Sequence, residues 1–190
     1  MTRFSWAAWG LLVVVLDLPF FGWDVLPDLV GYAWLFIGLA GGAAMHPALA
    51  RARAAALVGI PAAVVTGTPI TDDSNPIEWT GALVGILVMV VVLHQLATAV
   101  RDLDPAVGDS DHRRWADGIR VAAPVAGGIQ LVGLVGLATL LAVLYVIGLL
   151  ALVVVGIVTV VLLHRVNRAG WLAPATATAT AAPPPEPATS

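Results

Sequence analysis

The amino-acid sequence predicts an all-α, polytopic transmembrane helix bundle of about six spans with a disordered C-terminal tail. Hydrophobic residues make up 59% of the 190 residues and charged residues only 11%. A soluble domain averages about 45–50% apolar and about 25% charged residues. All nine basic residues are arginines, and they lie between or beside long apolar stretches. Because the chain is so apolar, we expect the lipid bilayer to be its main partner.

The apolar stretches define the predicted spans. A helix that crosses the hydrocarbon core needs about 20 residues, within a range of about 17–25. Arg3 and the apolar run after it resemble a signal peptide, but no small-residue cleavage site follows, so we interpret the run as a retained first helix. Turn residues or charges separate most of the later stretches. The predicted spans are roughly 4–21, 29–46, 54–70, 79–97, 120–142 and 145–164.

The last two predicted spans share one uninterrupted apolar region. No charged residue lies between Arg120 and His164. One helix over this region would be about 65 Å long, which is about twice the hydrocarbon thickness. Two helices are therefore predicted, with a turn near Ala142–Gly148, around Tyr145, whose side chain suits the membrane surface. A single long tilted helix is the alternative. Residues 98–119, which carry many charges, are predicted to form the longest connection.

The arginines predict the orientation of the spans. With six spans and a cytoplasmic N-terminus, every arginine falls on the cytoplasmic side, and the outer connections contain acidic but no basic residues. This is the positive-inside pattern of a multi-pass cell-membrane protein with both termini in the cytoplasm. The nine are Arg3, Arg51, Arg53, Arg101, Arg113, Arg114, Arg120, Arg165 and Arg168.

Two regions differ sharply in composition. Residues 1–171 contain all the predicted spans and form the bundle. Residues 172–190 are rich in alanine, proline and threonine and offer no apolar surface to bury. We therefore expect these residues to be a disordered cytoplasmic tail.

The segment that joins the first two spans carries the most distinctive motif. It reads Gly-Trp-Asp-Val-Leu-Pro-Asp-Leu-Val-Gly-Tyr over residues 22–32. It resembles a hairpin found in small multi-pass bacterial membrane proteins, with the pattern Gly-aromatic-Asp-(Ile/Val)-Leu-Pro-Asp-x-(Ile/Val)-Gly-Tyr. The resemblance implies a hairpin between two spans and implies no particular activity.

Two interpretations of this hairpin remain open. In the structural one, Asp24 caps the second span, Pro27 favours its first turn, the glycines let backbones approach, and Trp23 and Tyr32 lie at the membrane surface. In the functional one, the aspartates bind a cation or a proton, because ionisable groups near a span are candidates for function. The candidate residues are Asp17, Gly22, Trp23, Asp24, Pro27, Asp28, Gly31 and Tyr32.

Other patterns have weaker functional interpretations. His46, His94 and His164 fall at the predicted cytoplasmic ends of spans and would form a zinc site only if three helices converged. Their spacing is not a metal motif, and we predict no metal or cofactor. Glycine-rich faces, such as Gly38-x-x-x-Gly42 and Gly81-x-x-x-Gly85, are typical of close helix packing. They could instead mediate contacts between copies in a homo-oligomer.

The sequence contains no recognised catalytic motif. Phosphate-binding, dinucleotide-binding, serine-nucleophile and zinc-protease patterns are all missing, and there is no cysteine. The net charge of −3 argues against nucleic acid as a partner. No small-molecule ligand is evident from the sequence. We expect a non-enzymatic membrane accessory component, and the alternative is a small oligomeric channel or transporter for a cation or small solute.

Overall fold

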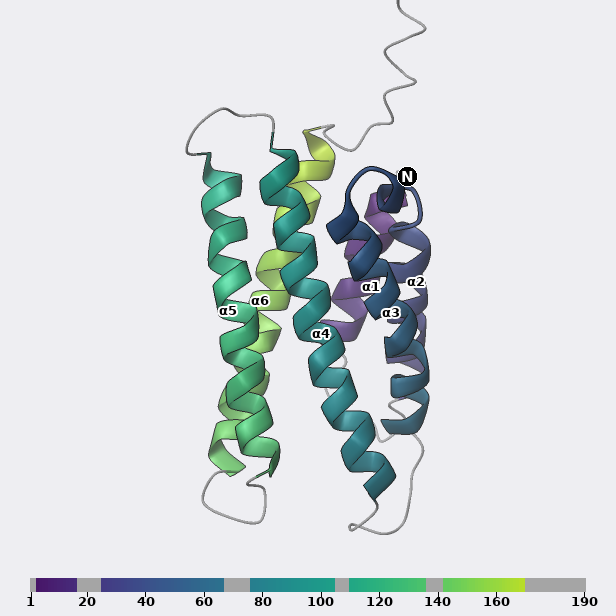
Figure 1. Ribbon diagram of the computed structural model, residues 1–190, viewed down its shortest axis with the longest axis vertical. Coiled ribbons are helices and arrows are strands. Elements are labelled where there is room, and N and C mark those ends of the chain that lie inside the picture. Colours follow the sequence, from purple (N-terminus) through teal and green to yellow (C-terminus); the bar gives the residue numbers. More distant parts are fainter. Residues whose placement is uncertain (1–2, 17–24, 67–75, 105–109, 136–141, 170–190) are drawn as a thin grey trace, which may run out of the picture.

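The fold consists of helices. The computed structural model describes residues 3–16, 25–66, 76–104, 110–135 and 142–169, and no strand occurs among them. All-α architecture is therefore confirmed for these ranges (Figure 1). The elements are α1 (Arg3–Leu16), α2 (Val25–Gly38), the 3₁₀ helix η1 (Gly42–Ala44), α3 (Pro47–Thr66), α4 (Pro76–Leu103), α5 (Asp111–Val135) and α6 (Ala142–Arg168).

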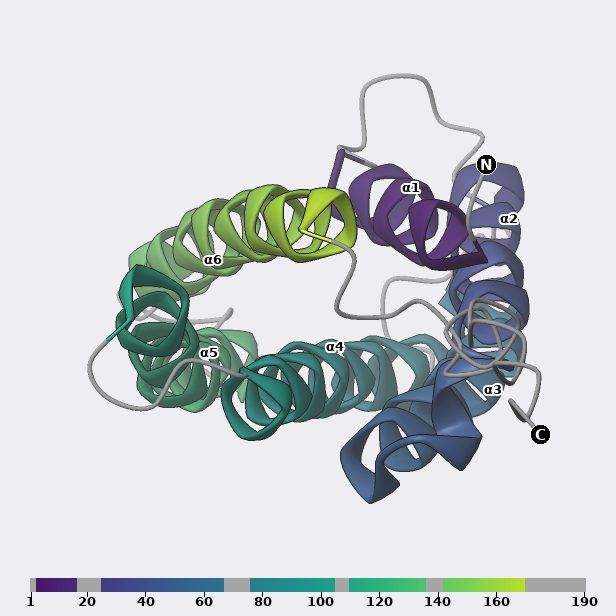
Figure 2. The same ribbon diagram turned by 90° about the horizontal axis from the view of Figure 1, so that it is seen from above.

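The helices form a closed ring in chain order. Each α-helix packs antiparallel against the next, and α1 packs against α6, which closes the ring (Figures 1 and 2). α4 also contacts α6 across the ring. Because the helices alternate in direction, the starts of α1, α3 and α5 lie at the same end as the ends of α2, α4 and α6. This is the end that carries the arginines.

Four helices are long and apolar enough to cross a membrane. They cover Pro47–Val65, Trp79–Leu103, Asp111–Val135 and Val143–Arg168, whereas the apolar parts of α1 and α2 are shorter. Large apolar side chains on these helices are exposed, including Leu87, Val125 and Val154. A polar solvent would disfavour such a surface, whereas lipid chains would cover it. Length, composition and exposed surface together indicate a transmembrane helical protein.

Glycines bring the backbones of neighbouring helices together. A methyl group added at Gly10 of α1 would lie 2.6 Å from the carbonyl oxygen of Gly31 in α2. On the other side of the ring, a methyl group at Gly148 of α6 would lie 2.5 Å from the Cα atom of Gln130 in α5. Only a residue without a side chain permits these approaches, which is the basis of small-residue packing in membranes. Here the packing is intramolecular.

Not every glycine on the glycine-rich helix faces brings two helices close together. Gly38 and Gly42 both contact α1, through Ala7 and Phe4 respectively. In contrast, side chains added at Gly85 or Gly128 would meet no atom within 4 Å. These last two glycines therefore leave open space on the surface of α4 and α5.

The predicted turn between the last two spans is misplaced. Two helices do occupy the region 120–164, but α6 begins at Ala142 and continues without a break through Tyr145 and Gly148. The connection falls within 136–141, outside the described residues. The predicted turn residues instead pack in the α5–α6 interface, where the backbone of Tyr145 lies against Gly133. Because this region is continuously apolar, the sequence has no polar break that marks the true position of the connection.

The connection predicted over 98–119 is also much shorter than expected. α4 extends to Leu103 and α5 begins at Asp111, so most of the charged residues are helical. A helix satisfies its own backbone hydrogen bonds and can continue past the hydrocarbon core into water. α3 likewise begins at Pro47 rather than near residue 54, and its first turns carry Arg51 and Arg53. The predicted tail, 172–190, lies outside the described residues.

Candidate functional site

Half of the predicted hairpin lies outside the described residues. Asp17, Gly22, Trp23 and Asp24 belong to the segment between α1 and α2, so the cation cluster and the Asp24 cap stay predictions. α2 begins at Val25, which puts Pro27 and Asp28 in its first turn. Proline suits the first turn of a helix, where its missing N–H costs no hydrogen bond, and an acidic residue there interacts favourably with the helix dipole.

The other half of the hairpin packs within the bundle. Gly31 lies against Gly10 and Val14 of α1. Tyr32 is only 4% exposed, and its ring lies on Gly59 of α3. Tyr32 is therefore a buried packing residue and not the surface anchor that its residue type suggests.

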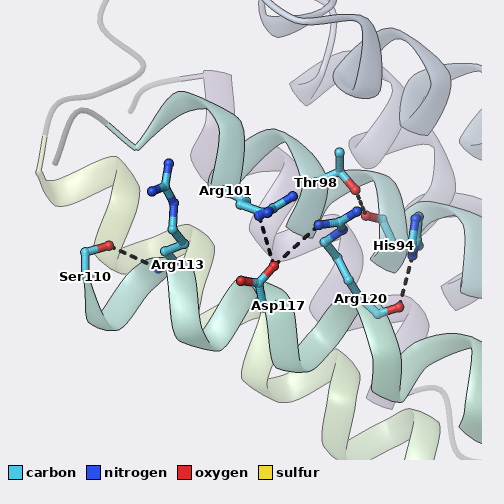
Figure 3. Close-up of polar contacts among 7 residues, drawn as sticks. All are labelled: His94, Thr98, Arg101, Ser110, Arg113, Asp117 and Arg120. Carbon is cyan, nitrogen blue, oxygen red and sulfur yellow. Dashed lines mark hydrogen bonds and ion pairs between the residues drawn. The ribbon is translucent and has the colours of Figure 1, made fainter. Parts of the chain in front are cut away.

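Described polar side chains concentrate at the arginine-bearing end, especially between α4 and α5. Figure 3 shows this α4–α5 polar cluster, which consists of His94, Thr98, Arg101, Ser110, Arg113, Asp117 and Arg120. Its centre is the carboxylate of Asp117. The Oδ1 atom of Asp117 lies 3.0 Å from Nε of Arg101 and 3.4 Å from Nη1 of Arg120 (Figure 3). The pair with Arg101 connects α4 to α5, whereas the pair with Arg120 lies within α5, and partial exposure limits each to about 1 kcal/mol or less.

His94 satisfies a backbone group that a proline leaves without its helical partner. Pro124 lies inside α5 and has no N–H, so the carbonyl of Arg120, four residues earlier, loses its usual donor. The Nδ1 atom of His94 lies 3.1 Å from that carbonyl oxygen (Figure 3). A carbonyl only accepts, so we assign the proton to Nδ1. A side chain from a neighbouring helix commonly restores such a contact in membrane helices.

Ser110 caps the start of α5. Its Oγ atom accepts a hydrogen bond from the N–H of Arg113 at 3.1 Å (Figure 3). Its hydroxyl donates to the carboxylate of Asp104. A serine immediately before a helix with its oxygen on the third residue is an N-cap. The sequence Ser110-Asp111 carried this start signal, which the many surrounding charges obscured.

Two further polar residues fasten α3 at the same end. The Nδ1 atom of His46 accepts from the N–H of Ala48 at 3.2 Å and caps α3, while its Nε2 atom lies 3.5 Å from a carboxylate oxygen of Asp102. Arg53 donates from Nε to the carbonyl oxygen of Phe36 at 3.2 Å and stacks on the Phe36 ring, 4.2 Å from its centroid. From the sequence, Arg53 is predicted only to be one of the cytoplasmic arginines, without these contacts.

The three histidines do not converge. His46 caps α3, His94 bonds to α5, and His164 is exposed on α6. Across the described ranges, no three side chains of histidine, cysteine, aspartate or glutamate form a group that could hold a metal ion.

The buried interior is largely apolar. Among the described residues, only Asp104, Gln130 and Thr159 are buried polar side chains. Asp104 lies at the arginine-bearing end, and Thr159 donates to the carbonyl oxygen of Val155 in its own helix at 2.8 Å. Gln130 packs against Gly148, and its Oε1 atom has no hydrogen-bond partner. Among these three residues, Asp104 therefore bonds to the Ser110 hydroxyl and Thr159 to its own helix backbone.

Comparison with known proteins gives no further assignment. No protein-family model, curated protein or solved structure matches this chain. The function must therefore be inferred from its own residues.

Proposed function

We propose that this chain is a six-span protein of the cell membrane, with both termini in the cytoplasm, that acts as a non-enzymatic accessory component. One observation carries the non-enzymatic part of the proposal. At the arginine-bearing end, His46, Arg53, His94 and Ser110 each bond to a backbone group of a helix end or a proline-disrupted turn. Side chains used in this way stabilise a scaffold and are not available to activate a substrate.

The apolar interior supports the same proposal. A pathway for ions or protons needs polar or ionisable groups along its length. Of the buried polar residues in the described part, only Gln130 and Thr159 lie away from the arginine-bearing end. The hydroxyl of Thr159 is directed to its own helix backbone. One amide side chain is a poor basis for transport, so we favour an accessory role over a channel.

The proposal of six spans depends on α1 and α2. α1 has 14 residues and is about 21 Å long. α2 is equally short, but helical hydrogen bonds continue beyond it, from Leu39 N–H to the Leu35 carbonyl and from Ala43 N–H to the Leu39 carbonyl. The path from Val25 to Ala44 therefore covers about 30 Å, the thickness of a hydrocarbon core. α1 lies beside it, with Leu11 fully buried.

The arginines support the proposed orientation. Arg51 and Arg53 lie at the start of α3, Arg101 at the end of α4, and Arg165 and Arg168 at the end of α6. The alternating helix directions bring these positions to one end of the ring (Figure 1). A single arginine-rich end is expected to face the cytoplasm.

Two experiments test the proposal. Reporter fusions at Ser74 and Ser190 should report the outside and the cytoplasm respectively; an external signal from Ser190 would contradict the six-span arrangement. Purified protein reconstituted in liposomes should leak cations no faster than empty liposomes. A cation flux that disappears in Asp28→Asn would replace the accessory role with that of a channel.

A further inference from the structure

A pocket of about 400 Å³ opens between α1 and α6 at the arginine-bearing end. Its apolar wall includes Trp9 and Leu12 of α1 and Val161 of α6. Trp9 and Val161 are 54% and 40% exposed, so the pocket is open at the surface. Farther towards the end of the ring, α6 adds His164, Arg165 and Arg168 to the lining. We call this site the α1–α6 pocket.

The charges at this pocket are not balanced by acids of the same two helices. Neither α1 nor α6 contains an aspartate or glutamate. The ion pairs of Asp102 and Asp117 are with His46 and with arginines of α4 and α5. Arg165 stacks on Trp115, with 4.9 Å from Cζ to the ring centroid. The ion pairs found among the described residues involve neither Arg165 nor Arg168.

We propose that the α1–α6 pocket binds an anionic phospholipid of the cytoplasmic leaflet. The guanidinium group of Arg168 would bind the phosphate, since planar N–H donors match phosphate oxygens. Arg165, which stacks on Trp115 of α5, would add positive charge at the mouth of the pocket. The upper part of an acyl chain would lie along Leu12 and Val161, with Trp9 at the membrane surface. Val161 and Arg168 are seven residues apart on α6, a rise of about 10 Å, which fits a glycerol backbone and the first part of a chain.

Charge complementarity selects this occupant. Basic pockets between transmembrane helices on the cytoplasmic side are typical binding sites for anionic headgroups. The combination of an apolar wall and a cationic mouth matches a molecule with a phosphate at one end and hydrocarbon at the other. The inference rests on the proposed orientation for its assignment to the cytoplasmic leaflet.

Native mass spectrometry of the full chain in detergent tests the proposal, with phosphatidylglycerol and phosphatidylcholine as probes. The wild-type protein should bind phosphatidylglycerol in preference to phosphatidylcholine. In Arg165→Gln/Arg168→Gln, phosphatidylglycerol affinity should fall roughly 25-fold, because each arginine near an anionic headgroup contributes about fivefold. The matched control is Arg51→Gln, which removes an exposed arginine at the same end, on α3. Its effect should stay within about twofold.

A second variant distinguishes lipid binding in the pocket from general attraction by surface charge. Val161→Trp keeps every charge and fills the pocket, so it should also weaken binding of phosphatidylglycerol. Unchanged binding in Val161→Trp, or equal losses in Arg51→Gln and the double variant, would overturn the proposal. If the double variant does not fold, Arg168→Gln alone should give a loss of about fivefold. The reporter fusions test orientation separately, so failure of the orientation and failure of the pocket give different results.

Discussion

Replacement of Gly148 by alanine tests whether this residue lies in a packed helix or in an exposed turn. The added methyl group of Gly148→Ala would lie 2.5 Å from Cα and 2.6 Å from Cβ of Gln130, and it would also meet the backbone nitrogen of that residue. A carbon atom placed this close must displace its neighbours. The backbone of α5 cannot rotate away as a flexible side chain can, so α5 and α6 must separate.

The expected change in the free energy of unfolding is the sum of two opposing contributions. Alanine in a helix interior is favoured over glycine by roughly 0.5–1 kcal/mol, because glycine loses more backbone entropy on folding. Overpacking of a well-packed interior costs typically about 1–3 kcal/mol. The matched control is Gly128→Ala in α5, since an added methyl group there meets nothing within 4 Å. Gly128→Ala should therefore be neutral or stabilising. Gly148→Ala gains the same helix preference, so it should be less stable than this control by the overpacking cost alone, about 1–3 kcal/mol.

The assay is the stability of the folded protein in detergent, measured from the loss of helical signal with denaturant and from thermal aggregation. Both variants are compared with the wild type in the same detergent. Equal stability of Gly148→Ala and Gly128→Ala would refute the close approach of α5 and α6. It would favour the turn near Ala142–Gly148 that apolar continuity suggested.

The remaining predictions concern His94 and Asp28. His94→Leu should destabilise the protein by about 1–3 kcal/mol, because the carbonyl of Arg120 loses its donor in a partly buried position. In the background of Pro124→Ala, which restores the helical N–H, the same change should cost much less; equal costs in both backgrounds in a double-mutant cycle of unfolding would contradict the assigned contact. For Asp28, a helix-dipole role predicts a loss of only about 0.3–1 kcal/mol in Asp28→Asn and no effect of added cations on stability. Stabilisation of the wild type by a cation, abolished in Asp28→Asn, would instead favour a binding site.

The helix ends show where sequence reasoning was limited. Hydropathy measures which residues avoid water, and a helix can extend beyond its apolar part. The end of α4 and the start of α5 are polar helical segments, stabilised by the Ser110 cap and by the ion pairs of Asp117. Of these contacts, the ion pair between Arg101 and Asp117 joins two different helices. From the sequence alone, the charged residues at the end of α4 and the start of α5 therefore look like those of a solvated connection.

The candidate site shows the same limit more strongly. The sequence predicts only that His94 lies near a membrane surface, and nothing in it connects His94 with Pro124. Their connection arises because the carbonyl of Arg120, freed by Pro124, faces α4. Similarly, Trp9 and Arg168 lie near opposite ends of the described chain, and only the closure of the ring by α1 and α6 puts them in one pocket.

By itself, the sequence determined the all-α class, the apolar segments and the distribution of the arginines. These properties depend on the transfer of individual side chains and local segments between water and an apolar environment, which is additive along the chain. Only the tertiary structure decided where the α5–α6 connection falls, why Tyr32 is buried, and which polar side chains serve which backbone groups. Those outcomes depend on contacts between helices, and in an apolar chain many helix registers have nearly equal hydropathy. The choice among them comes from the fit of glycines against facing backbones, which becomes defined only when both helices are in place.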